Sequence, residues 1–130
     1  MRYTSLSIVL AALLLLPSCS EGPTSSKYVP LPMTITGVVT DSETQAGIGD
    51  VLMQANEFGF ISHEPATLAE TRTNNEGRYT LKFEVDKSTC REDKYSLWAL
   101  KDFYETGPHS GTIKCARQVQ VINVQLIPLQ

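Results

Sequence analysis

Hydrophobic side chains recur at every second residue through most of the chain beyond residue 32. A period of two is typical of strands with one buried face, and no window of about 11 residues there has the 3.6-residue period of a helix. The inward-facing sets that this period predicts are Met33, Ile35 and Val39; Val51, Met53 and Ala55; Tyr79, Leu81 and Phe83; and Tyr95, Leu97 and Ala99. The sequence therefore predicts an all-β domain of about seven strands, arranged as a β-sandwich with a Greek-key-like topology.

The alternation also predicts how particular strands pair. Residues 67–73 and 78–84 flank the stretch Asn74-Asn75-Glu76-Gly77, whose residue types tolerate positive φ, so we expect these segments to form a hairpin. Near the C-terminus, Val119 and Val121 share one phase, whereas Ile122, Val124 and Leu126 share the other. A change of phase by one residue predicts a β-bulge or a crossing between sheets.

Residues 1–18 have the pattern of an export signal. Met1 and Arg2 give a short positive start, and the apolar run from Leu6 to Leu16 is shorter than the roughly 20 residues of a membrane-spanning helix. The next stretch, Leu16-Pro17-Ser18-Cys19, resembles the lipobox of bacterial lipoproteins, with Pro17 where that family usually has a smaller residue. An ordinary secretory signal followed by a coincidental cysteine is the alternative.

The lipobox resemblance implies a lipid anchor at Cys19. In that family the thiolate of the cysteine takes up diacylglycerol, the signal is removed before it, and the new amine is usually acylated, so palmitate should label the chain. Several acyl chains at one residue hold a protein on a membrane far better than one. Ser20 follows Cys19 in place of the Asp associated with inner-membrane retention. We therefore expect a location in the bacterial cell envelope, at the outer membrane.

The stretch from Cys19 to Pro32 is predicted to be a flexible tether. It is rich in Pro and Ser and has neither a two-residue nor a 3.6-residue period, so it buries too little apolar area to offset its ordering entropy. The expected organisation is a signal peptide at 1–18, a lipidated tether at 19–32 and one β-sandwich domain at 33–130.

Two cysteines remain if Cys19 is acylated. Cys90 and Cys115 are an even pair, and an exported protein enters an oxidising compartment. We therefore expect them to form a disulfide that stabilises the domain. Two buried free thiols are the alternative.

The strand and turn sequences resemble the carboxypeptidase regulatory-like domain. The residues that carry the resemblance are Ile35 to Asp41, Thr73 to Leu81 and Tyr95 to Leu97, and its most specific part is Gly77-x-Tyr79-x-Leu81 behind a polar turn. The resemblance extends from Thr34 to Leu126. It departs from the family at Gly47, often Pro, at Asp50, often Gly, and at Asn74, usually Asp.

That resemblance implies an Ig-like, prealbumin-like (transthyretin-like) sandwich of seven strands. It also implies a non-catalytic module used for structure or attachment, with no active-site residues, no cofactor and no metal. From the residues themselves, the position of Gly77 requires a backbone free of a Cβ, and Tyr79 and Leu81 then enter the core.

Catalytic patterns are weak in this chain. His63-Glu64 lacks the second His that a zinc-protease helix needs, because residue 67 is Thr, and Ser110 is not at the centre of a nucleophile elbow. A metal site made by His63, Glu64 and His109 requires two loops to converge. The alternative to a non-enzymatic role is thus a small hydrolase or metal-dependent enzyme on a transthyretin-like scaffold.

The signatures of the prealbumin-like enzymes are missing from the chain. The hydrolases of ureide-like rings in that fold have an Arg-Gly-Ser tail after Tyr, whereas this chain ends Ile127-Pro128-Leu129-Gln130. Asp41, Glu43 and Asp50 cluster in one turn region as a calcium candidate. Their spacing matches no calcium loop, so we interpret them as a solvated acidic turn.

Aromatic residues near the end of the 95–100 strand predict a binding surface. Trp98 and Leu100 have the opposite phase from Leu97, and Phe103 and Tyr104 follow at once. Such a surface stacks on sugars or docks a partner strand. In the alternative, Trp98 covers the sheet edge or packs under the loop between residues 107 and 115.

The chain has 11 basic and 14 acidic residues and a net charge of −3. It therefore lacks the excess of positive charge that is typical of nucleic-acid-binding proteins. The sequence therefore predicts a membrane-anchored, non-catalytic envelope lipoprotein. Its β-sandwich is expected to contact another envelope component, either a protein or a glycan.

Overall fold

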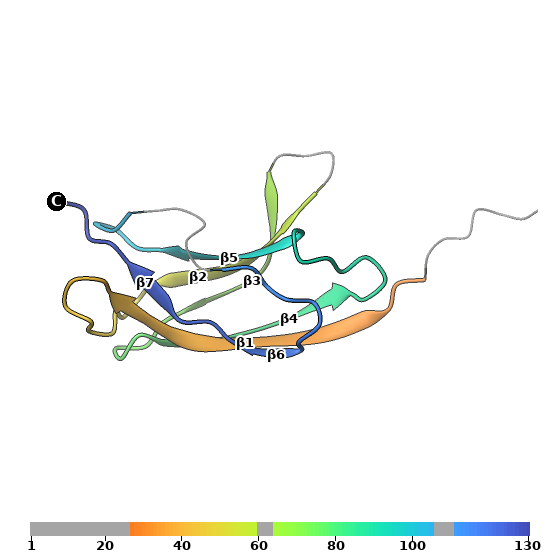
Figure 1. Ribbon diagram of the computed structural model, residues 1–130, viewed down its shortest axis with the longest axis horizontal. Helices are drawn as coiled ribbons and strands as arrows, with labels where there is room; N and C mark the ends of the chain where they lie inside the picture. Colours follow the sequence, from red (N-terminus) through yellow and green to blue (C-terminus); the bar gives the residue numbers. More distant parts are fainter. Residues whose placement is uncertain (1–26, 60–63, 106–110) are drawn as a thin grey trace, which may run out of the picture.

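Seven strands in two facing sheets make up the computed structural model, which describes residues 27–59, 64–105 and 111–130 (Figure 1). The strands are β1 (Pro30–Asp41), β2 (Leu52–Phe58), β3 (Pro65–Arg72), β4 (Arg78–Asp86), β5 (Tyr95–Leu100), β6 (Val119–Val121) and β7 (Val124–Leu126). One sheet has the order β4-β1-β6, with β7 also paired to β1, and the other has the order β3-β2-β5. The predicted all-β sandwich is confirmed. No helix in the described ranges is long and apolar enough to cross a membrane.

The core lies between the two sheets and is made of the predicted inward-facing residues. All of them except the half-buried Phe83 are at most 4% exposed. Ile113, Val124 and Leu126 extend this core from the C-terminal part of the chain. Alternating burial thus places the polar residues of each strand on the outer faces, where they meet solvent.

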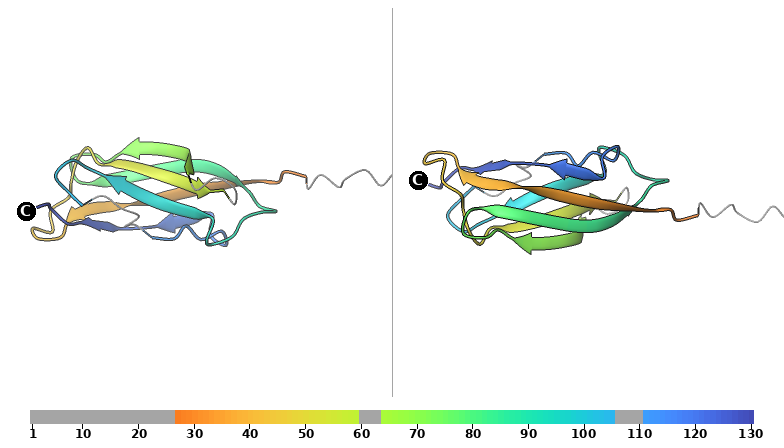
Figure 2. Two further views of the ribbon diagram at one scale, coloured as in Figure 1. Left: turned by 90° about the horizontal axis from the view of Figure 1, so that it is seen from above. Right: turned by 90° about the horizontal axis from the view of Figure 1, so that it is seen from below.

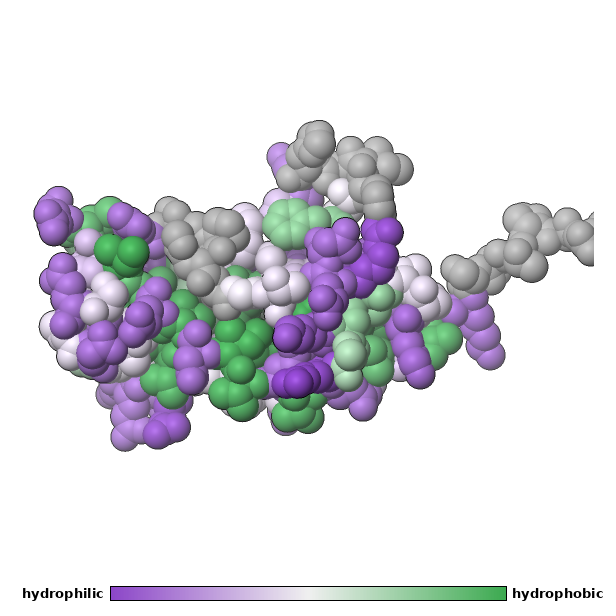
Figure 3. Space-filling model, viewed as in Figure 1, coloured by the Kyte–Doolittle hydropathy of each residue, from purple (hydrophilic) through white to green (hydrophobic). Residues whose placement is uncertain are grey.

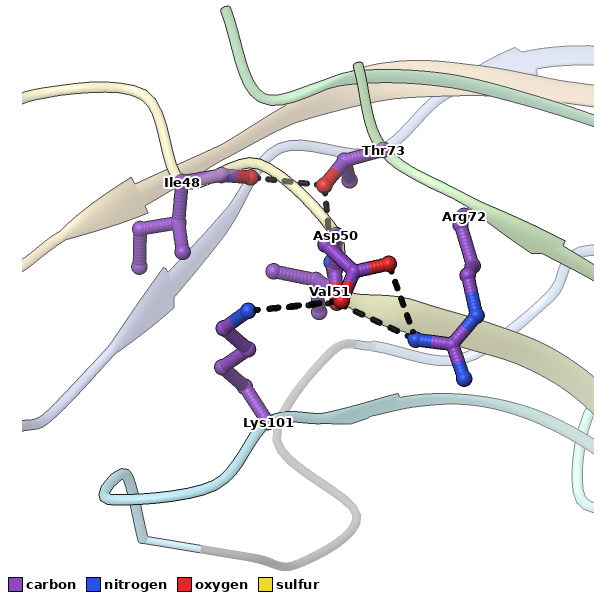
Figure 4. Close-up of polar contacts among 6 residues, drawn as sticks. All are labelled: Ile48, Asp50, Val51, Arg72, Thr73 and Lys101. Atoms are coloured by element: carbon purple, nitrogen blue, oxygen red, sulfur yellow. Dashed lines mark hydrogen bonds and ion pairs between the residues drawn. The ribbon is translucent and has the colours of Figure 1, made fainter. Parts of the chain in front are cut away.

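The predicted hairpin between residues 67–73 and 78–84 is wrong. β3 pairs with β2 and β4 pairs with β1, so the connecting turn crosses from one sheet to the other. Thr73 is bound to the β3-β2-β5 sheet, because its N–H donates to the carbonyl of Val51, just before β2, and its hydroxyl accepts from the N–H of Val51 (Figure 4). Gly77 is bound to the β4-β1-β6 sheet, since its carbonyl accepts from the N–H of Val39 on β1. The four-residue turn is therefore an arch.

The expected change of phase near the C-terminus is also wrong. β6 and β7 both run parallel to β1 with one constant register, in which Thr36 is opposite Val121 and Val39 is opposite Val124. The residue that faces inward on β6 is Gln120, 7% exposed, and the two valines beside it face solvent. A buried glutamine, rather than a bulge, accounts for the apparent break in the hydrophobic pattern.

The Cys90–Cys115 disulfide is present, with a Cα–Cα distance of 5.8 Å. It joins the β4–β5 loop to the segment that leads into β6. Both lie at the end of the sandwich where β1 begins (Figures 1 and 2). This end is the one that follows the predicted tether.

β1 begins at Pro30, inside the stretch for which we predict a tether. Pro30 and Pro32 pair with Asp86 and Glu84 of β4. The main-chain N–H and C=O groups of even-numbered β1 residues point toward the β6 side, because the N–H of Thr34 donates to the carbonyl of Gln118. The paired part of β6 begins only opposite Thr34, so Pro30 and Pro32 lie before it. The missing N–H groups of the prolines therefore face a side with no partner strand in the described chain, where they interrupt no ladder.

Candidate functional site

A pocket of about 600 Å³ lies at the end of the sandwich opposite the start of β1. It forms where β2 begins and where β3 and β5 end, together with the chain that follows β5 and the C-terminal segment. The lining residues are Asp50, Leu52, Arg72, Leu100, Lys101, Asp102, Phe103, Tyr104, Glu105 and Leu129. We call it the distal pocket, because the sandwich separates it from the predicted tether.

Three neighbouring strands supply one side of the distal pocket. Leu52 is opposite Arg72 on β3 and opposite Leu100 on β5, so these side chains form a row across the outer face of the sheet. Both leucines are only half-buried. This row gives the pocket an apolar wall with a guanidinium at one end.

Two basic side chains neutralise Asp50 at the mouth of the pocket (Figure 4). Its carboxylate lies 3.1 Å from Nη1 of Arg72 and 3.7 Å from Nζ of Lys101, and both nitrogens also donate to its main-chain carbonyl. Asp50 has a φ of 59°, a left-handed conformation that Asp adopts more readily than most residues. Asp50 and Arg72 are exposed and Lys101 is partly exposed, so the two pairs add little stability, and we assign them a positioning role for the start of β2.

The chain after β5 is held by the C-terminal segment. The N–H of Leu129 donates to the carbonyl of Phe103, and the N–H of Glu105 donates to that of Ile127, both at 2.8 Å. Phe103 is 83% exposed and has a φ of 68°, and Leu129 is 60% exposed. The pocket thus has an apolar rim made of two segments that are far apart in sequence.

Asp41, one of the calcium candidates, closes a turn instead. Its carboxylate accepts from the N–H groups of Glu43 and Thr44 and from the hydroxyl of Tyr104, at 2.8 to 2.9 Å. These bonds, led by the one from the N–H of Thr44, lower the pKa of Asp41. The bond that the Tyr104 hydroxyl donates to Asp41 raises the pKa of Tyr104. Asp41 therefore connects the β1 turn to the pocket wall.

The lowered pKa predicts a pH dependence of stability. Bonds to the charged carboxylate of Asp41 stabilise the fold fully above its ordinary pKa of 3.8, and this contribution is lost as the pH falls through the lower, folded-state pKa. The stability gap between the native chain and Asp41→Asn should therefore shrink below about pH 3.8. Thermal melting of both proteins from pH 7 to pH 2 measures it. A gap that stays constant down to pH 2 would contradict the role given to Asp41.

Three of the four residues predicted as a binding surface meet in the distal pocket, namely Leu100, Phe103 and Tyr104. Trp98 does not line it. Its ring lies against Phe58, with centroids 6.3 Å apart, and its buried Nε1 has no acceptor among the described residues. The loop invoked in the alternative for Trp98 lies partly outside the described residues.

Sequence reasoning missed the other members of this surface, which are Asp50, Leu52, Arg72, Lys101, Asp102, Glu105 and Leu129. The sequence signal for these residues was weak. It consisted of an acidic residue, Asp50, before one predicted strand and a basic residue, Arg72, near the end of another.

The metal-site alternative involves residues that the structure largely leaves out. His63 and His109 lie outside the described residues, and Glu64 is exposed. In the parts that are described, no group of three His, Cys, Asp or Glu side chains is arranged to hold a metal ion.

Cys19, the predicted site of the lipid anchor, also lies outside the described residues.

Comparisons with known proteins show the fold and no family. No protein-family model matches the chain, and no curated protein matches it. An alternative pilotin from the type II secretion system of Vibrio cholerae is similar in structure, with a TM-score of 0.50 and 17% identity over 76% of this chain and 98% of the pilotin. A 9R-lipoxygenase from Cyanothece PCC8801 has a TM-score of 0.50 and 11% identity over 75% of this chain, which spans only 16% of the lipoxygenase.

Proposed function

We propose that this protein is a bacterial envelope lipoprotein, anchored through Cys19, whose sandwich is a non-catalytic module that binds another envelope protein in the distal pocket. The tether joins the sandwich at one end and the pocket opens at the other, so an anchored domain would present the pocket away from its membrane. The half-buried leucines and the exposed Phe103 and Leu129 suit an apolar side chain of a protein partner better than a glycan.

Phe103 is the observation that carries this proposal. A bulky side chain at positive φ costs of order 1 kcal/mol, and strained residues of this kind persist mainly at functional sites. Phe103 recovers little of that cost by packing, because 83% of its surface is exposed. Aromatic residues, Phe among them, are enriched in protein interfaces, so a ring held outward at the rim of a pocket suits a binding anchor.

The domain type is part of the same proposal. We infer that the sandwich is of the carboxypeptidase regulatory-like kind. Gly77 has the positive φ of 79° expected for its motif, and Asp50 has a positive φ where that family often has Gly. The match to nearly the whole length of a pilotin supports a secretion-system component as the first partner to test.

The anchor is tested by Cys19→Ser. We expect this change to abolish labelling by radioactive palmitate and to move the chain from the membrane fraction to the soluble fraction, because serine has no thiolate to alkylate. Cys90→Ser serves as the control and should keep the label. Labelling that survives Cys19→Ser would contradict the proposed anchor.

The pocket is tested by Phe103→Gly. Glycine removes the ring and relieves the positive φ, so we expect thermal stability to stay level or rise while partner binding falls. A photo-crosslinking residue at Glu105, on the rim, should trap one envelope protein in the native chain and much less of it in Phe103→Gly. The matched control is the crosslinker at Tyr28, exposed at the tether end. Equal crosslinking with and without the ring would contradict the proposal, and a crosslinked glycan would replace the protein partner.

A further inference from the structure

The edge strand β6 presents two valines to solvent. Val119 and Val121 are 72% and 71% exposed, on a strand that lies at the margin of its sheet (Figure 2). Hydrophobic side chains gather over the β6–β7 edge of the molecule (Figure 3). Neither residue lines the distal pocket, so this surface is separate from the function proposed above.

Gln120 fixes the outward position of the valines. Its side chain points into the sandwich, where Oε1 accepts from the N–H of Lys114 and Nε2 donates to the carbonyls of Lys114 and Arg117, at 2.8 to 2.9 Å. A fully bonded inward glutamine holds the strand in this phase. The fold therefore gives an inward position to a polar residue and two outward positions to apolar residues, the reverse of the usual pattern.

The main chain of β6 is open on its outer side. The carbonyl of Gln118 and the N–H of Ile122 bond to β1, so even-numbered residues point toward β1. The N–H and C=O groups of Val119 and Val121 consequently point outward, and they have no hydrogen-bond partner within the described residues.

The other sheet edges differ from β6. β4 carries Lys82 and Glu84, and β3 carries Glu70 and Arg72, charges that discourage pairing with another chain. The edge of β5 is partly covered, because Ser96 forms a bridge with Thr112. In the described part of the chain, β6 is the edge strand whose side chains on the outer face of the sheet are apolar and that contains no charged residue.

The surroundings of β6 are basic in an acidic protein. Residues 111–130 contain Lys114 and Arg117 and no Asp or Glu, although the whole chain has a net charge of −3. The bonds of Gln120 hold both basic residues beside the start of the strand. A second copy of this chain would bring the same basic edge and offer no charge complementarity.

We propose that the β6 edge binds an extended, acidic segment of a protein partner by strand addition. The main chain of the segment pairs with Val119 and Val121, its alternate apolar side chains cover the two valines, and its acidic residues lie near Lys114 and Arg117. Main-chain pairing supplies the affinity, and the charges set the direction and choice of segment.

The test uses a synthetic peptide of alternating valine and threonine led by two glutamates, added to the ¹⁵N-labelled full chain in detergent micelles. We expect the amide signals of Val119 and Val121 to shift and their hydrogen exchange to slow. Val121→Pro removes an outward N–H that the fold does not use, and it should weaken peptide binding about tenfold. Arg117→Glu should weaken binding by a similar factor, and it tests the proposal even where the proline variant fails to fold.

Thr80→Pro, the same change on the open edge of β4, is the matched control and should leave peptide binding unchanged. A peptide led by two lysines should bind less well than the glutamate peptide. Equal binding of the two peptides, or shifts confined to other strands, would overturn the proposal. Shifts of Val119 and Val121 that depend on protein concentration without peptide would also overturn it, because the occupant would then be a second copy.

Discussion

Replacing Cys90 and Cys115 together with serine is expected to lower the free energy of unfolding by about 3.5 kcal/mol. The disulfide spans a separation of 25 residues, and removing it returns the loop-closure entropy to the unfolded chain. Domains of this size have a net stability of roughly 5 to 15 kcal/mol, so the loss is a large share. Urea unfolding measures it, with Cys19→Ser in both proteins so that no lipid is attached.

The disulfide prediction has a thiol count as its control. The reference protein with Cys19→Ser should show no reactive thiol when denatured without reductant, and two after reduction. Hydrogen exchange should rise most around β6, because Cys115 leads into that strand. A loss of stability below about 1 kcal/mol would contradict the entropic account, since the model for a loop of this length requires several times more.

The core was predictable from sequence because burial in a strand repeats every two residues. Whether Leu81 or Ala99 faces inward depends only on its own strand, so the local pattern is sufficient. The all-β class follows from the same signal. The disulfide followed from the even cysteine count and the export signal.

Strand pairing was not predictable in the same way, because it depends on contacts between distant residues. The turn at Asn74–Gly77 has the residue types of a hairpin, yet Thr73 bonds to β2 and Gly77 bonds to β1. Gln120 misled the phase analysis because its buried amide is satisfied by the main chain of residues 114 and 117. A hydrophobicity pattern treats such a glutamine as exposed.

The candidate site was partly predictable for a related reason. Leu100, Phe103 and Tyr104 are close in sequence, so their outward phase and aromatic character identified them together. Asp50 and Leu129 reach the same pocket from other parts of the chain. Their contribution depends on strand order, which the sequence pattern does not contain.

Gly77→Ala is expected to lower the free energy of unfolding by about 3 to 4 kcal/mol, from two additive causes. At a φ of 79° a side chain costs roughly 1 to 2 kcal/mol by itself. A Cβ at this position would also overlap the carbonyl oxygen of Val39, and that carbonyl accepts from the N–H of Ile48. The overlap forces main chain apart where the arch meets β1, so the bond between Val39 and Gly77 is strained as well.

Gly111→Ala separates these two causes, because Gly111 also has a positive φ, 114°, but among the described residues a Cβ there meets only Cγ2 of Ile122, at 3.6 Å. It should therefore cost only the conformational part, about 1 to 2 kcal/mol. Urea unfolding of both variants gives the difference, which measures the steric part at Gly77. Equal losses in the two variants would show that conformation alone selects glycine in the arch. The closeness of the Val39 carbonyl on β1 would then not contribute to the requirement for glycine at residue 77.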